Sequence, residues 1–189
     1  MVHLSTVRAA ACALLVLLSS GCALQAPRYQ PSIDNVEVIK RSQARPVMIG
    51  NFSVQAGAVG GSAIGLRGSS MASPVGSDYA AYLADALRQE LALAGKLDSK
   101  SDIELSGLLT KNDIAAGGFS TNSGEIEARF IVKSGGQVRY DAVKRAELSW
   151  ESSFVGAIAI PKAQQQYPVV VQQLLKALLE DAQFKSALR

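Results

Sequence analysis

The sequence is poor in the residues that most often carry chemistry. Its 189 residues include one histidine, His3, and two cysteines, Cys12 and Cys22. The formal net charge is only +3, without a dense cluster of Lys and Arg, which argues against a nucleic-acid partner. No stretch reaches the roughly 18 consecutive apolar residues that a membrane-spanning helix needs. The hydrophobic fraction of 48% is nevertheless ordinary for a globular protein, so wholesale disorder is excluded.

The first 21 residues have the pattern of a secretory signal peptide. Arg8 is the only charged residue before the apolar run 9–18, and Ser19-Ser20-Gly21 gives an exit of small residues. A helix over this run covers about half of a ~30 Å hydrocarbon core. Residues 1–21 are therefore predicted to be a removable signal rather than a permanent membrane span.

The end of this segment resembles the signal of bacterial lipoproteins, in which a small residue precedes a lipidated cysteine that begins the mature chain. Gly21-Cys22 matches, whereas Ser19 stands where that family usually has Leu. The resemblance implies lipidation of Cys22, with acyl chains of the palmitate type. Ala23 is not the Asp that usually holds such proteins at the inner membrane, so it also implies the outer membrane of a diderm bacterium, facing the periplasm. The alternative is a secreted protein with a cysteine near its cleavage site.

The predicted mature chain has no histidine, and its one cysteine would be capped by lipid. This composition excludes an intrachain disulfide, the histidine-dependent catalytic sets and a conventional zinc site. We therefore expect no metal, no cofactor and no enzymatic activity. Paired carboxylates, Glu125 with Glu127 and Glu147 with Glu151, are the remaining candidates for hydrolytic chemistry. A solvated charged face of a sheet is the simpler interpretation of them.

Beyond the signal, the sequence predicts two parts. Residues 22–45 contain Pro27, Pro31 and mixed charge, and they are predicted to be the lipidated Cys22 followed by an extended tether. Residues 46–189 are predicted to form a single periplasmic domain.

Within that domain, residues 55–77 are rich in glycine and predict a flexible loop. Neither a phosphate-binding loop nor a dinucleotide fingerprint fits, because the spacing is irregular and no Gly-Lys-Ser/Thr follows. A role in contacting a partner is the alternative for this loop. The candidate contact residues are Val59, Ile64, Leu66, Arg67 and Met71.

Hydrophobic periodicity predicts the order strand, helix, three strands, helix. The predicted strands are 46–54, 103–110, 125–133 and 138–155, and the helices are 78–94 and a last one entered after Pro161 and Pro168. Phe130, Trp150 and Phe154 are expected to point into the core, and a bulge is expected near Val143-Lys144. The predicted fold class is α+β: a four-stranded, mostly antiparallel sheet with two amphipathic helices packed on one face.

This layout, with the motif at Cys22, resembles small lipoproteins of the YajG and lipopolysaccharide-assembly (LptE) kind. The resemblance implies a non-enzymatic accessory or assembly/transport factor of the cell envelope. Its partners would be the outer membrane, through acyl chains on Cys22, and an envelope protein. The alternative is a periplasmic module that binds lipid or glycan. No residue of a binding site is implied, because only the motif at Cys22 matches.

Overall fold

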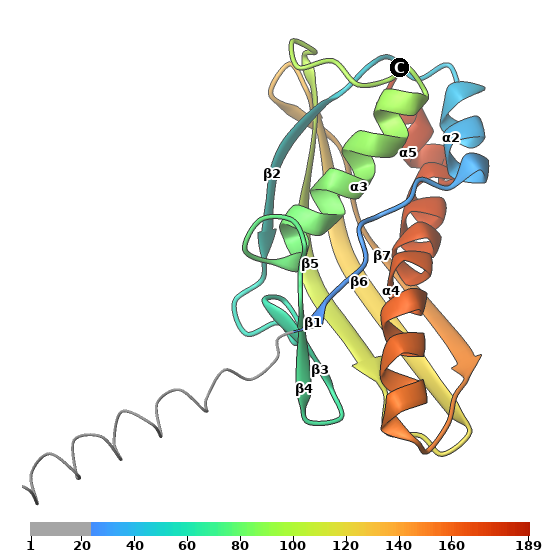
Figure 1. Cartoon of the computed structure of the whole chain (residues 1–189). Coiled ribbons are helices and arrows are strands. Elements are labelled where there is room, and N and C mark those ends of the chain that lie inside the picture. Colours follow the sequence, from blue (N-terminus) through green and yellow to red (C-terminus); the bar gives the residue numbers. More distant parts are fainter. Residues whose placement is uncertain (1–23) are drawn as a thin grey trace, which may run out of the picture.

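The computed structural model describes residues 24–189, and Figure 1 shows its elements. The signal 1–21 and Cys22 therefore lie outside the described residues. In chain order, the strands are β1 (Leu24–Gln25), β2 (Met48–Val54), β3 (Ala63–Leu66), β4 (Ser69–Ala72), β5 (Ile103–Ala115), β6 (Thr121–Ser134) and β7 (Gln137–Glu151). The helices are α2 (Ile33–Lys40), α3 (Tyr79–Leu93), α4 (Gly156–Leu179) and α5 (Ala182–Ala187).

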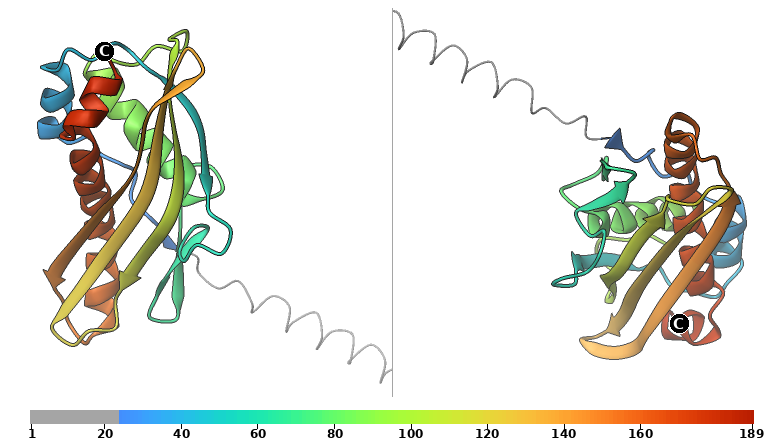
Figure 2. Two further views of the ribbon diagram at one scale, coloured as in Figure 1. Left: turned by 180° about the vertical axis from the view of Figure 1, so that it is seen from behind. Right: turned by 90° about the horizontal axis from the view of Figure 1, so that it is seen from below.

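The main sheet has the strand order β2-β5-β6-β7, with β2 parallel to β5 and the other pairs antiparallel. Helices α3 and α4 cover one face of it, as Figures 1 and 2 show. The α+β class is thus confirmed. The expectation of one sheet is wrong, because a second, three-stranded sheet forms in the order β1-β4-β3.

The second sheet arises from the segment predicted to be a flexible loop. Strands β3 and β4 form a hairpin whose two central residues, Arg67 and Gly68, both have positive φ, at 49° and 84°. This is the backbone of a two-residue turn that suits the twist of a hairpin. Ile64 and Met71 are paired across the hairpin and fully buried. Burial of this alternating apolar set orders the segment despite its glycines.

The N-terminal segment is packed on the body, so the extended tether expected at 22–45 is wrong for residues 24–45. Strand β1 pairs with β4, and α2 begins at Ser32, whose side chain caps it. Tyr29 and Ile39 are buried. Val36 and Val38 lie in α2, which packs against α3 and α4.

A buried carboxyl group holds this segment in place. Glu90 of α3 is fully buried, and its Oε1 accepts hydrogen bonds from the Tyr29 hydroxyl, from the Ser32 backbone N–H at 3.2 Å and from Asn35 Nδ2 at 3.1 Å. Burial raises the pKa of Glu90, although these hydrogen bonds oppose the rise. The group is enclosed and its partners come from the packed segment, so its role is structural.

The core follows the predicted alternation along β5 and β6. Phe130 is fully buried and Trp150 is 7% exposed, which confirms both as core residues. Tyr79 and Tyr82 of α3 are also buried, and both rings contact Tyr167 of α4. Because the two helices meet through these aromatic rings, they form one layer over the sheet.

Two local expectations are corrected. Helix α4 begins at Gly156 and continues through Pro161 and Pro168, instead of starting after them. The irregularity in β7 lies at Arg139, because Tyr140 pairs with Val132 and Val138 pairs with the next residue of β6. No bulge is needed near Val143-Lys144, since Lys144 faces the helices and forms an ion pair there with Asp181 at 2.5 Å.

Candidate functional site

Several segments from distant parts of the chain meet at one end of the molecule, called here the β1 end. It comprises residues 24–27, 66–72, 116–120 and 152–160. The view from below in Figure 2 shows β1, the β3–β4 hairpin and the start of α4 near one another. Two hydrogen bonds join them: the Ala26 N–H donates to the Ala72 carbonyl at 2.9 Å, and Gln164 Nε2 donates to the Gln25 carbonyl at 3.0 Å.

Arg67 holds the two loops of the β1 end together. Its guanidinium donates to backbone carbonyls of the β5–β6 loop, at Ala116 (2.5 Å) and Gly118 (2.9 Å). It also donates to the carbonyls of Ser153 (3.1 Å) and Phe154 in the β7–α4 loop. No acidic side chain within residues 24–189 forms an ion pair with Arg67. Its positive charge is therefore balanced by carbonyl dipoles alone.

The same loops are joined by a second polar link. Asn122, at the start of β6, is buried; its Oδ1 accepts from the Gly118 N–H at 3.0 Å, and its Nδ2 donates to Ser152 Oγ at 2.7 Å. The Ser152 N–H in turn donates to the Ser120 carbonyl at 2.8 Å. With their backbone groups occupied in this way, both loops have a defined shape.

The polar links leave apolar side chains on the surface. Phe119 and Phe154 are 75% and 65% exposed, and their rings stack in parallel with centroids 5.0 Å apart. Val155 and Ile158 beside them are also more than half exposed. The Arg67 guanidinium lies 6.0 Å from the centre of the Phe154 ring, within range of a cation–π interaction. We call Phe119, Phe154, Val155 and Ile158 the phenylalanine patch.

None of the predicted partner-contact residues belongs to the phenylalanine patch. Ile64, Leu66 and Met71 are fully buried, so the expectation that they contact a partner is wrong. Val59 is 59% exposed, and its carbonyl accepts a hydrogen bond from the Asn112 N–H of β5. Arg67 does lie at the site, but as its internal clamp. Cys22 falls outside the described residues.

The phenylalanine patch was missed from the sequence. Phe154 was assigned to the core because it continues the alternation that passes through Trp150. Strand β7 ends at Glu151, so the alternation no longer determines which way Phe154 points. The available signal was two phenylalanines, each within an uncharged stretch rich in Gly and Ser.

Glu125 and Glu147, one from each candidate carboxylate pair, are engaged with cations on the outer face of the main sheet. Glu125 and Glu147 are cross-strand neighbours, and Arg145 binds both, at 2.9 Å and 3.3 Å. Lys111 also binds Glu125, at 2.7 Å. Glu127 accepts a hydrogen bond from Thr110 at 2.7 Å. This pattern is that of a charged, solvated sheet face.

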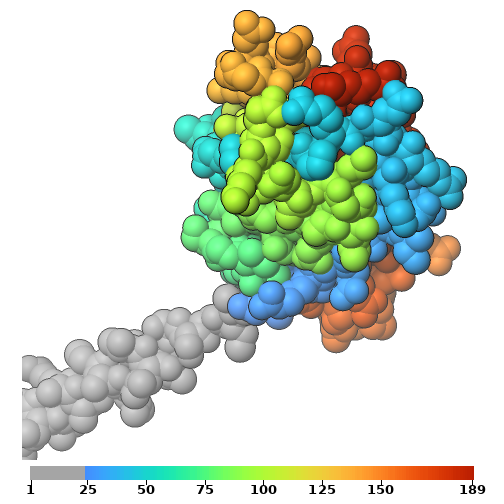
Figure 3. Space-filling model, turned by 90° about the horizontal axis from the view of Figure 1, so that it is seen from above, coloured from blue at the N-terminus to red at the C-terminus, as the bar shows by residue number. Residues whose placement is uncertain are grey.

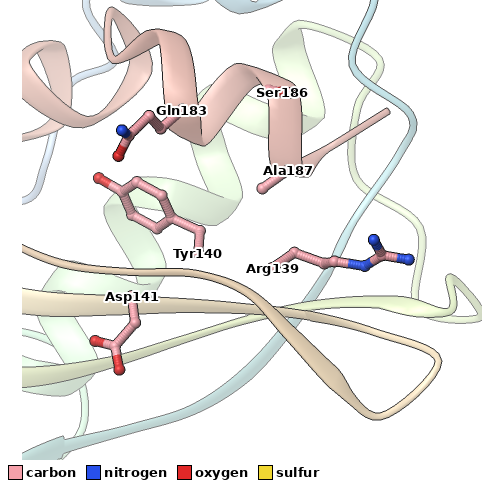
Figure 4. Close-up of a pocket in the computed structure, with 6 residues that line it drawn as sticks. All are labelled: Arg139, Tyr140, Asp141, Gln183, Ser186 and Ala187. Carbon is pink, nitrogen blue, oxygen red and sulfur yellow. The ribbon is translucent and has the colours of Figure 1, made fainter.

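A surface cleft of about 410 Å³ lies between the start of β7 and α5, at the other end of the molecule (Figure 4). Its lining side chains do not converge: Tyr140 points toward α5, whereas Arg139 and Asp141 point away from it. The Tyr140 hydroxyl donates to Asp181 at 2.9 Å, and Asp141 binds Arg129. These groups stabilise the fold and do not form a catalytic arrangement.

Within residues 24–189, no group of three or more His, Cys, Asp or Glu side chains is placed to bind a metal ion. None of the helices in this part is long and apolar enough to cross a bilayer.

Known proteins resemble this chain in structure rather than in sequence. No family model and no curated protein matches it. A crystal structure of a protein of family DUF330 from Xanthomonas campestris is similar over 83% of this chain and 94% of that one, with a TM-score of 0.52 and 16% identity. A candidate lipoprotein from Caulobacter crescentus is similar over 56% of this chain and 80% of that one, with a TM-score of 0.41 and 14% identity. The Xanthomonas protein shares the fold.

Proposed function

We propose that this chain is a lipid-anchored protein of the bacterial envelope, held in the outer membrane through acyl chains on Cys22 and facing the periplasm. In this proposal it acts by binding, as an accessory or assembly factor, and catalyses no reaction. The observation that carries it is the position of Cys22, which ends the signal pattern and stands two residues before Leu24, where the packed body begins. Such a linkage joins the anchor directly to the fold.

The arrangement of polar groups supports a binding role. Glu125 and Glu147, one member of each carboxylate pair considered for hydrolysis, are bound by Lys111 and Arg145, and Glu90 is fully buried. The outer face of the main sheet, by contrast, is left uncovered by α3 and α4. An accessory factor needs such a free face to meet an envelope protein.

Anchoring is tested by replacing each cysteine separately. Cys22→Ser is expected to lose labelling by palmitate and to move from the membrane to the soluble fraction. Cys12→Ser is the matched control, because that residue lies within the signal and its loss should leave the membrane fraction unchanged. Continued membrane fractionation of Cys22→Ser would contradict the proposal.

Sorting and partnership need separate measurements. Density-gradient separation should place the wild type with outer membranes and Ala23→Asp with inner membranes. A photo-crosslinker at Val143, exposed on the sheet face, should capture an envelope protein in cells, with Leu93 on α3 as the control position. Absence of any protein adduct from Val143 would count against the accessory role.

A further inference from the structure

We propose that the phenylalanine patch is a second membrane contact, which inserts into the bilayer interface beside the acyl chains of Cys22. The inference rests on the proposed lipidation for its anchor. It commits to one occupant, the apolar boundary of a phospholipid bilayer, and four observations support it.

The first is distance along the chain. Leu24 pairs with Met71, which is four residues from Arg67 at the hairpin turn, so about 13 Å of chain separate this pairing from the Arg67 backbone. The two residue steps from Leu24 to Cys22 add at most about 7 Å. The guanidinium of Arg67 directly contacts the loop that carries Phe154. Acyl chains on Cys22 would therefore enter the bilayer close to the patch.

The second is composition. The four segments of the β1 end contain one charged residue, the cation Arg67, and the nearest acid along the chain is Glu151 at the last position of β7. Burying a charge in an apolar interface is costly, so a surface almost free of charge suits a bilayer.

The third is the conformation of the loops. Arg67 and Asn122 satisfy the backbone groups of both loops from within, so exposure of Phe119 and Phe154 is built into the fold. Among residues 24–189, the stacked rings have only each other and Arg67 as aromatic or cationic neighbours. Phenylalanine is a side chain that interfacial membrane proteins bury at the boundary between headgroups and acyl chains.

The fourth is the contrast with the opposite end. Figure 3 looks onto that end, where the β6–β7 turn and the C-terminal helix lie. The exposed apolar residues at that end include Val138, but neither Phe119 nor Phe154. Because a lipid chain adds only a limited binding energy, a second apolar contact on the same side strengthens anchoring and fixes orientation.

The test places a fluorescent probe at each end of the full-length, lipidated protein. In a Trp150→Phe background, Phe119→Trp and Val138→Trp each give a protein with a single tryptophan. Trp150 is a suitable residue to replace, because its buried Nε1 has no hydrogen-bond partner within the described chain. The proteins are reconstituted in vesicles of phosphatidylethanolamine and phosphatidylglycerol, with and without brominated phosphatidylcholine as a quencher.

Emission from Phe119→Trp is expected to shift to the blue and to lose most of its intensity with brominated lipid, whereas emission from Val138→Trp should change little. Equal quenching of the two, or none at Phe119→Trp while the protein floats with the vesicles, would overturn the inference. Failure to float at all would instead refute the lipid anchor. A blue shift that depends on protein concentration and needs no vesicles would assign the patch to a second copy and also overturn it.

Discussion

Each end of the molecule carries a pair of aromatic rings, but the two pairs differ in burial. At the far end Tyr140 of β7 and Phe184 of α5 meet edge to face, 5.5 Å apart, and both are buried. At the β1 end Phe119 and Phe154 stack at 5.0 Å and are mostly exposed. The difference is that a helix closes one end of the sheet, whereas two loops leave the other open.

The charged residues of the two ends differ in the same sense. Burial opposes ionisation of Asp181, but hydrogen bonds from Lys144, Tyr140 and the backbone of α5 lower its pKa to about 2. The charge of Asp181 is therefore balanced by Lys144 within the chain. Arg67 is balanced only by carbonyl groups, so the β1 end retains a positive charge and an apolar surface. The closed end buries its aromatic pair, whereas the open end exposes one and is suited to contact with another surface.

The largest effect should come from removing the buried ring at the far end. Phe184→Ala is expected to lower the free energy of unfolding by about 3–5 kcal/mol, because it creates a cavity where the side chain is fully buried. Urea denaturation measures the loss, and hydrogen exchange should show α5 losing protection first. A cost similar to that of replacing Phe154 would remove the contrast between the ends.

Next in size is the loss of the clamp. Arg67→Ala removes hydrogen bonds to four carbonyl groups and should cost about 2 kcal/mol, since bonds that involve a charged group are the stronger kind. Residues 116–120 and 152–155 should exchange amide hydrogens faster, while α5 is unaffected. Arg67→Lys keeps the charge but not the planar fork, so it should recover only part of the loss.

The strands show what local pattern can predict. The core positions predicted for Phe130 and Trp150 are confirmed, because side chains alternate every two residues along a strand and the sequence therefore shows which face is buried. Phe154 was misplaced for the same reason: the pattern continued in the sequence after the strand had ended at Glu151. Beyond the end of the strand, hydrogen bonds from a distant arginine fix the conformation of the loop. Strand periodicity therefore no longer predicts which side chains are buried.

The N-terminal segment shows what local pattern cannot predict. The packing of this segment on the body depends on Glu90, which lies 61 residues after Tyr29 in the chain. Nothing in the local sequence distinguishes Glu90 from an ordinary helix residue. Likewise, β3 and β4 gain their third strand from β1, more than forty residues earlier. Proline and mixed charge suggested a tether and glycines suggested a flexible loop, because the partners that order both segments are remote.

A smaller, pH-dependent effect is expected at Asp181. Asp181→Asn should cost about 1–2 kcal/mol at neutral pH, because it leaves the partly buried Lys144 without its anion. Asparagine is also a good N-cap, so α5 keeps its start and the change isolates the charge.

The direction of the pH dependence follows from the lowered pKa. The carboxylate contributes fully above the unfolded value, near 4, and its contribution is lost as the pH falls toward 2. Denaturation curves of the wild type and the variant should therefore converge over that range. A constant difference between them down to pH 2 would show that Asp181 does not carry the effect.

The smallest effect on stability should come from the open end. Phe119→Ser and Phe154→Ser remove exposed side chains, so each should change the free energy of unfolding by less than about 0.5 kcal/mol. The combined variant should nevertheless orient less uniformly on vesicles, which fluorescence depolarisation of a label at Val138 would detect. If the combined variant stays stable but loses its uniform orientation, the rings are needed for the membrane contact and not for the fold. A loss of stability comparable to that of Arg67→Ala would instead make the rings part of the fold, and the two ends would then differ only in exposure.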